Sequence, residues 1–377
     1  MQTASVKRGP QVSASTVSAG PGRLGDPDRT LATDPRTDPG LLALMTQLCL
    51  AGTGAPAPAP ATLDADTLRR AVGKSDDAFT GLYAAIPLDA PDDRQVDVDI
   101  TTVTVDGDGS QPPVDIHVFR AAGTPAVAPG VVYLHGGGMT ILPTRSRVHD
   151  RWCADIAAAG AVAISVDFRN AYTAAGNNPF PAGLDDCCHA IAWIHRNRTE
   201  LGLSSVVLQG ESGGGNLVIA AALRARRDGF ADAIDGVYAC VPYISGGYNW
   251  DAERKLRELP SMIENNGYLI ECSAMGLLVA TYDPTGEHSQ DPLAWPYWAS
   301  AADLQGLPPH VITVNELDPL RDEGLAYYRA LCAAGVPTRG RINPGIVHGS
   351  EMIFRAALGR LNRWVVSDIA SFAGTLL

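Results

Sequence analysis

The segment Gly-Glu-Ser-Gly-Gly at residues 210–214 restricts the fold more than any other, because it joins a strand to a helix through a sharp turn. The apolar residues 206–208 before it are typical of a buried strand, and residues 216–223 after it are typical of a helix. The flanking glycines allow the turn and expose the Ser212 hydroxyl near the positive end of that helix. A glycine-rich turn can also serve packing alone. The strand before it and the helix after it favour a nucleophilic serine.

A second glycine-rich turn, His-Gly-Gly-Gly at residues 135–138, follows another apolar strand at residues 131–134. By itself this sequence indicates a flexible turn. Consecutive glycines also let backbone N–H groups approach an anion without interference from side chains, and acyl transfer needs such donors for its tetrahedral oxyanion. Upstream of a serine turn, the segment therefore predicts one half of an oxyanion hole.

Three histidines that follow Ser212 compete for the role of general base. His310 begins a strand-like segment, where a histidine is more often structural, and His288 lies in a polar stretch where we expect it to be solvated. His348 lies in a loop between a short strand and the last helix, from which it can turn toward the serine. We therefore predict that His348 is the base.

The carboxylate that would orient this base is predicted to be Asp318, just after the strand at residues 311–315. Glu316, Asp322 and Glu323 are rivals in the same segment. Asp322 and Glu323 fall in the first turn of a helix, where carboxylates commonly serve only the helix dipole. The order serine, aspartate, histidine is that of the α/β-hydrolases.

Four segments together resemble the hormone-sensitive-lipase family of bacterial serine esterases: residues 135–138, 210–216, 318–324 and 347–349. The resemblance extends over roughly residues 35–377. It implies an α/β-hydrolase fold, a reaction without cofactor or metal, and a defined set of site residues. These are the triad Ser212, Asp318 and His348, and the oxyanion donors, which are the backbone N–H groups of Gly137, Gly138 and Gly213.

The sequence departs from the usual family pattern in two places. Glu211 and Gly213 replace the usual aspartate and alanine beside the serine, and residues 170–173 read Asn-Ala-Tyr-Thr where many members have Leu-Ala-Pro-Glu. Neither change removes a catalytic group. Glu211 is expected either to bond a neighbouring loop or to be solvated.

Strand-like segments recur along the chain and predict an α/β fold with an eight-stranded, mostly parallel sheet that has an antiparallel start and is flanked by helices. They lie at residues 96–105, 114–119, 131–134, 161–166, 205–209, 236–241, 311–315 and 338–342. An Asp-Gly stretch at residues 106–109 predicts a hairpin between the first two. The helical segments outside this pattern predict a cap. The predicted divisions are a flexible tail (1–38), the N-terminal part of the cap (39–95), the first part of the core (96–244), a cap insertion (245–300) and the second part of the core (301–377).

The amino-acid composition bears on the cellular compartment of the protein and on the classes of partner that it can bind. The net charge of −12 argues against nucleic acid or an anionic membrane as a partner. No apolar stretch suggests a signal peptide or is long enough to span a bilayer. The chain has seven cysteines, an odd number, and Cys187 and Cys188 are adjacent, which indicates free thiols. Free thiols are typical of a reducing compartment, so we expect a cytoplasmic protein. The sequence leaves open whether the protein is a homodimer.

The sequence thus predicts a serine carboxylesterase that hydrolyses small soluble esters through an acyl-enzyme, with Met139, Leu142 and Tyr243 lining its pocket. The same triad would serve an amidase, and lactones or aromatic diesters stay open as substrates. A non-catalytic receptor of the same fold is disfavoured because the predicted base is present.

Overall fold

The computed structural model describes residues 20–376 apart from residues 54, 55, 91, 92, 94, 95, 108 and 110. Its centre is one eight-stranded sheet in the order β1-β2-β4-β3-β5-β6-β7-β8. The strands are β1 (Val98–Val105), β2 (Val114–Ala121), β3 (Ala128–Leu134), β4 (Val162–Val166), β5 (Leu203–Glu211), β6 (Gly236–Cys240), β7 (His310–Asn315) and β8 (Thr338–Asn343).

The pairing of the strands confirms the predicted sheet. β1 pairs antiparallel with β2, and β2 pairs antiparallel with β4, whereas all later neighbours are parallel. Part of the hairpin predicted at residues 106–109 lies outside the described residues. Every residue of β4, β6 and β7 is buried, as expected for parallel strands covered on both faces.

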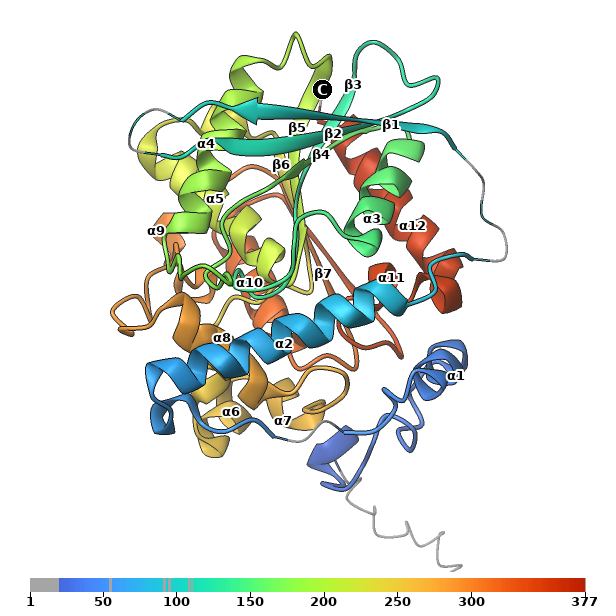
Figure 1. Ribbon diagram of the computed structural model, residues 1–377, viewed down its shortest axis with the longest axis vertical. Coiled ribbons are helices and arrows are strands. Elements are labelled where there is room, and N and C mark those ends of the chain that lie inside the picture. The colour runs from blue at the N-terminus through green and yellow to red at the C-terminus, as the bar shows by residue number, and fades with distance from the viewer. Residues whose placement is uncertain are drawn as a thin grey trace, which may run out of the picture.

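Helices cover both faces of this sheet (Figure 1). α3 (Arg147–Ala158) and α12 (Arg355–Gly374) lie on one side, and α4 (Ala182–Arg196) and α5 (Gly213–Asp228) lie on the other. α10 (Arg321–Ala333) packs along β7 and β8. Within the described residues, no helix combines the length and apolar character needed to cross a membrane.

The cap consists of segments that are far apart in the sequence. α2 (Ala65–Ala85) lies beside α8 (Cys272–Tyr282) at one end of the molecule (Figure 1). The other elements between β6 and β7 are η4 (Gly247–Asn249), α6 (Ala252–Glu258), α7 (Ser261–Glu264), η5 (Pro296–Trp298) and α9 (Ala301–Leu304). α1 (Pro39–Gln47) packs against α12 of the core instead, so α2 is the helix from the predicted N-terminal cap that joins the insertion.

The flexible tail predicted for residues 1–38 is wrong for residues 20–38, and residues 1–19 lie outside the described residues. After η1 (Gly22–Leu24), Leu31 is fully buried. Arg36 Nη1 lies 2.6 Å from Glu264 Oε1 of α7, and Asp34 accepts a hydrogen bond of 3.1 Å from the Tyr268 hydroxyl. A polar composition suggested disorder, but these polar side chains find partners on the cap.

Candidate active site

Ser212 occupies the sharp turn that joins β5 to α5. Its φ of 55° and ψ of −117° lie outside the conformations that L-residues prefer, which is backbone strain of the kind found at functional sites. The turn requires its glycines, because a Cβ on Gly214 would lie 1.8 Å from the carbonyl oxygen of Leu134. The Ser212 N–H donates to the Cys240 carbonyl at 3.0 Å, which ties the turn to the end of β6.

The structure brings Asp318 and His348 together, as predicted. The distance from His348 Nδ1 to Asp318 Oδ2 is 2.8 Å, and Asp318 is fully buried after β7. Its other oxygen accepts from the backbone N–H of Leu320 at 2.9 Å, so the carboxylate is held on both sides. Burial lowers the pKa of His348, but the charge and hydrogen bond of Asp318 outweigh this effect and raise that pKa above its ordinary value.

The rival carboxylates have other partners. Glu316 Oε2 accepts from the backbone N–H of Gly345 at 2.8 Å, and Asp322 Oδ2 accepts from that of Ser261 at 2.7 Å. Glu323 is buried and accepts from backbone N–H groups where the cap insertion begins. Each of them holds a loop in place, and Asp318 is the member of this set that bonds to His348.

The rival histidines are also placed as expected. His310 is buried in β7, and its Nδ1 lies 2.7 Å from the carbonyl oxygen of Pro308. The side chain of His288 is 38% exposed, and its Nδ1 lies 3.7 Å from Asp291 Oδ2. Neither lines the pocket that holds Ser212 and His348.

The glycine loop after β3 packs against the serine turn backbone to backbone. Gly137 and Gly138 have φ values of 99° and 61°, which favour glycine. A Cβ on Gly213 would lie 2.6 Å from the backbone nitrogen of Gly138, so a larger residue after the serine would press on the loop. Among the described residues, none accepts a hydrogen bond from the N–H groups of these three glycines.

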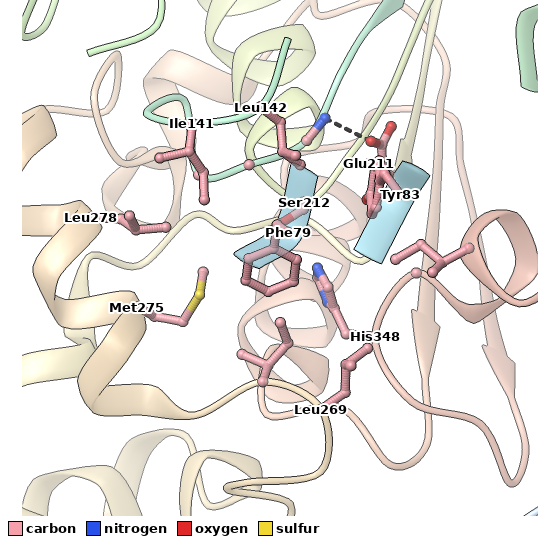
Figure 2. Close-up of a pocket in the computed structure, with 16 residues that line it drawn as sticks. Phe79, Tyr83, Ile141, Leu142, Glu211, Ser212, Leu269, Met275, Leu278 and His348 are labelled. Carbon is pink, nitrogen blue, oxygen red and sulfur yellow. Dashed lines mark hydrogen bonds between the residues drawn. The ribbon is translucent and has the colours of Figure 1, made fainter. Parts of the chain in front are cut away.

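Glu211 connects the glycine loop to the serine turn, a role that the sequence left open. Its Oε1 accepts from the backbone N–H of Gly136 at 2.6 Å, which Figure 2 marks as a dashed line, and from the Tyr133 hydroxyl at 3.1 Å. Burial raises the pKa of Glu211 to about 8, although both hydrogen bonds oppose this. The residue before the nucleophile therefore fixes the distance between the two turns.

A pocket lies beside Ser212 and His348 (Figure 2). The glycine loop, the serine turn, α2, the cap insertion and the loop after β8 all contribute to its wall. Its lining residues are Phe79, Tyr83, Gly136, Gly137, Gly138, Ile141, Leu142, Glu211, Ser212, Leu269, Ile270, Met275, Leu278, His348, Gly349 and Ile353. Apart from the reacting groups and Glu211, the side chains are apolar or aromatic.

Of the three residues predicted to line the pocket, Leu142 does so, whereas Met139 and Tyr243 do not. Met139 is buried beneath the loop, and its carbonyl accepts from Ala171 N–H at 2.9 Å. The Tyr243 hydroxyl donates to the Met275 carbonyl at 2.8 Å, so this side chain supports α8 from behind. Both side chains are buried in the protein and lie outside the lining of the pocket.

Sequence reasoning missed the pocket residues that come from the cap. Phe79 and Tyr83 are one helical turn apart on α2, which places them on the same face. The sequence places both residues in the predicted N-terminal part of the cap, but it did not single them out as lining the pocket. Leu269, Met275 and Leu278 come from the insertion and had no local signal.

Known proteins share both the sequence pattern and this architecture. A family model described as an alpha/beta hydrolase fold matches residues 131–352. The carboxylesterase NlhH of Mycobacterium tuberculosis is 34% identical over 229 residues, which are 59% of this chain and 66% of that protein. Esterase LipI of the same species is 32% identical, over 64% of this chain and 72% of that protein.

Solved structures extend the likeness to almost the whole chain. Brefeldin A esterase, described as a bacterial homologue of human hormone sensitive lipase, has a TM-score of 0.92 and 54% identity, covering 95% of this chain and 99% of that one. Esterase Est22 has a TM-score of 0.77 and 34% identity, covering 91% of this chain and 99% of that one. These matches confirm the resemblance drawn from the motifs, and the chain belongs to the α/β-hydrolase fold family, among relatives of the hormone-sensitive-lipase type.

Proposed function

We propose that the protein is a serine carboxylesterase with Ser212 as nucleophile, His348 as general base and Asp318 as the residue that orients the base. The observation that carries the proposal is the 2.8 Å bond between His348 and Asp318, at a pocket that also contains Ser212 on its strained turn. Similar proteins named carboxylesterase or esterase support the reaction class.

The reaction begins when His348 Nε2 takes the proton of the Ser212 hydroxyl as its oxygen attacks the ester carbonyl carbon. Asp318 holds the proton on Nδ1 and stabilises the imidazolium that forms. The imidazolium then gives its proton to the departing alcohol, which leaves an acyl group on Ser212. A water molecule, deprotonated by His348, attacks this acyl-enzyme and releases the acid.

The N–H groups of Gly137, Gly138 and Gly213 are the proposed oxyanion donors. The absence of acceptors for them among the described residues, and the close approach of the two turns, support this assignment. Such donors act because they are fixed before the charge develops, so little reorganisation is needed during the reaction. The apolar wall of the pocket suits the uncharged acyl and alkyl groups of small esters.

The proposal is tested by steady-state hydrolysis of p-nitrophenyl butyrate by the wild-type protein and Ser212→Ala. We expect kcat to fall by about four to six orders of magnitude, because nucleophile and base act as one unit. Ser204→Ala, a substitution at the start of β5 and away from the pocket, is the matched control and should keep wild-type kcat. Near-normal turnover by folded Ser212→Ala protein would refute the assignment.

A further inference from the structure

The described residues that line the pocket include a carboxyl group but no lysine or arginine. Among the described residues that line it, the ionisable side chains are Tyr83, Glu211 and His348, and none is lysine or arginine. Two arginines of neighbouring elements, Arg36 and Arg321, both pair with Glu264, at 2.6 Å and 2.8 Å. Neither contributes to the pocket wall.

A carboxylate on a substrate would therefore find no lysine or arginine to pair with among the described residues of the pocket wall. It would lose its water against an apolar wall, which is costly for an ion without a counter-ion. One buried carboxyl group, that of Asp318, already lies beside His348, 2.8 Å from its Nδ1. The positive charge that His348 acquires during the reaction is matched by Asp318, so it is not available to a second anion.

We propose that the pocket accepts neutral esters and rejects esters that carry a carboxylate close to the reacting carbonyl, so that a short dicarboxylic diester loses one alcohol and is released as the half-ester. This inference rests on the proposed function. In the first step the acyl C–O bond breaks, the alcohol takes the proton from His348, and water then supplies the hydroxyl of the new acid. At neutral pH that acid ionises, and its charge opposes a second cycle.

The test compares three substrates of similar size at pH 7.5: diethyl succinate, monoethyl succinate and ethyl succinamate. The amide of the third is neutral and as polar as an uncharged acid, so it separates charge from size and polarity. We expect kcat/KM for the half-ester to be at least about 100-fold below that for the diester, after correction for the two equivalent ester groups and for the rates of alkaline hydrolysis. Ethyl succinamate should fall within about tenfold of the diester.

Spacer length provides a second comparison with the unmodified protein. In half-esters of longer diacids the carboxylate can reach solvent outside the pocket, so the preference for the diester should shrink as the spacer lengthens from succinate to sebacate. In a pH-stat, diethyl succinate should release about one proton equivalent and then stop. Three results would overturn the inference. They are equal rates for the diester and the half-ester, equally low rates for the half-ester and ethyl succinamate, and release of two proton equivalents from diethyl succinate without a pause.

A substitution in the wall tests the cause directly. Leu269 lines the pocket and is only half-buried, so a longer side chain there can be accommodated (Figure 2). Leu269→Lys should raise kcat/KM for monoethyl succinate relative to diethyl succinate by about tenfold or more, whereas Leu269→Gln should leave the ratio unchanged. An unchanged ratio in both variants would contradict the inference. Failure of the protein to hydrolyse diethyl succinate and p-nitrophenyl butyrate would instead contradict the proposed esterase function.

Discussion

Glu211 illustrates at the scale of one residue how the two turns of the site are joined. Its carboxyl group is buried one position before Ser212 and accepts the Gly136 N–H at 2.6 Å. The proposed oxyanion donors lie on both turns, so we expect their spacing to depend on this contact. A change that removes the contact should therefore affect the transition state more than the bound substrate.

Replacement of Glu211 tests this positioning role. Glu211→Gln keeps an oxygen that can accept from Gly136, so kcat should stay within about tenfold of the wild type. Glu211→Ala removes the acceptor, and kcat should fall by about 100- to 1,000-fold with little change in KM. Tyr133→Phe is the matched control, since it removes the 3.1 Å bond to the same oxygen and a 3.7 Å contact with Met352 Sδ but leaves the bond from Gly136 in place. If Gln and Ala variants lost activity equally, the hydrogen bond would not be the reason for the glutamate.

The pKa of His348 predicts the pH dependence of the reaction. Asp318 raises this pKa above 6.5, and only neutral His348 can accept the serine proton. kcat/KM should therefore rise with pH along a limb whose midpoint lies above 6.5. In Asp318→Asn the charge is lost while burial remains, so the midpoint should move to lower pH and kcat should fall. A midpoint that does not move would mean that Asp318 does not act on the base.

At the scale of elements, the N-terminal segment of residues 20–38 supports the parts of the chain that carry the acid and the base. Glu264 of α7 receives Arg36 from this segment and Arg321 from α10. The neighbouring Asn265 side chain donates to the Asp318 carbonyl at 3.1 Å, and the Asp38 N–H donates to the Gly345 carbonyl at 2.8 Å. The segment is thus packed against both catalytic loops.

Replacement of Arg36, which pairs with Asp34 at 2.7 Å as well as with Glu264, measures this support. Arg36→Met leaves Glu264 buried with one cation fewer, and the free energy of unfolding should decrease by about 1–3 kcal/mol. This is less than for a fully buried pair, because Arg36 is 21% exposed. Arg29→Met breaks a 3.6 Å pair with Asp26 at the surface and should change stability by less than about 0.5 kcal/mol. Urea denaturation checks both, and equal effects would show that the segment is not anchored through Arg36.

The elements that could be predicted from the sequence are those with local signals. The sequence predicts all eight strands and the serine turn, mostly from apolar runs and glycine placement. β8 is the least apolar of these strands and has exposed positions, but it was also predicted. The N-terminal segment and the cap side of the pocket could not be predicted, because their contacts join distant residues. Arg36 and Glu264, for example, are 228 positions apart. No local pattern marks such a pair.

At the scale of the whole molecule, the site lies where the carboxyl ends of the central strands meet the cap. Ser212 follows β5, Asp318 follows β7 and His348 follows β8, so one edge of the sheet presents all three groups. α2 and the cap insertion contribute apolar side chains to the pocket beside these strand ends. The sheet therefore positions the three proposed catalytic residues, and α2 and the insertion between β6 and β7 contribute apolar residues to the pocket wall.

Covalent labelling shows whether Ser212 is the nucleophile. The protein is treated with diethyl p-nitrophenyl phosphate, whose phosphoryl group is captured by an activated serine, and is then digested and mapped by mass spectrometry. We predict one diethylphosphoryl group per chain on Ser212, formed in step with p-nitrophenol release and loss of esterase activity. Labelling should be abolished in Ser212→Ala and strongly slowed in His348→Ala. Stoichiometric inactivation with the label on another residue, or full activity with Ser212 labelled, would contradict the account.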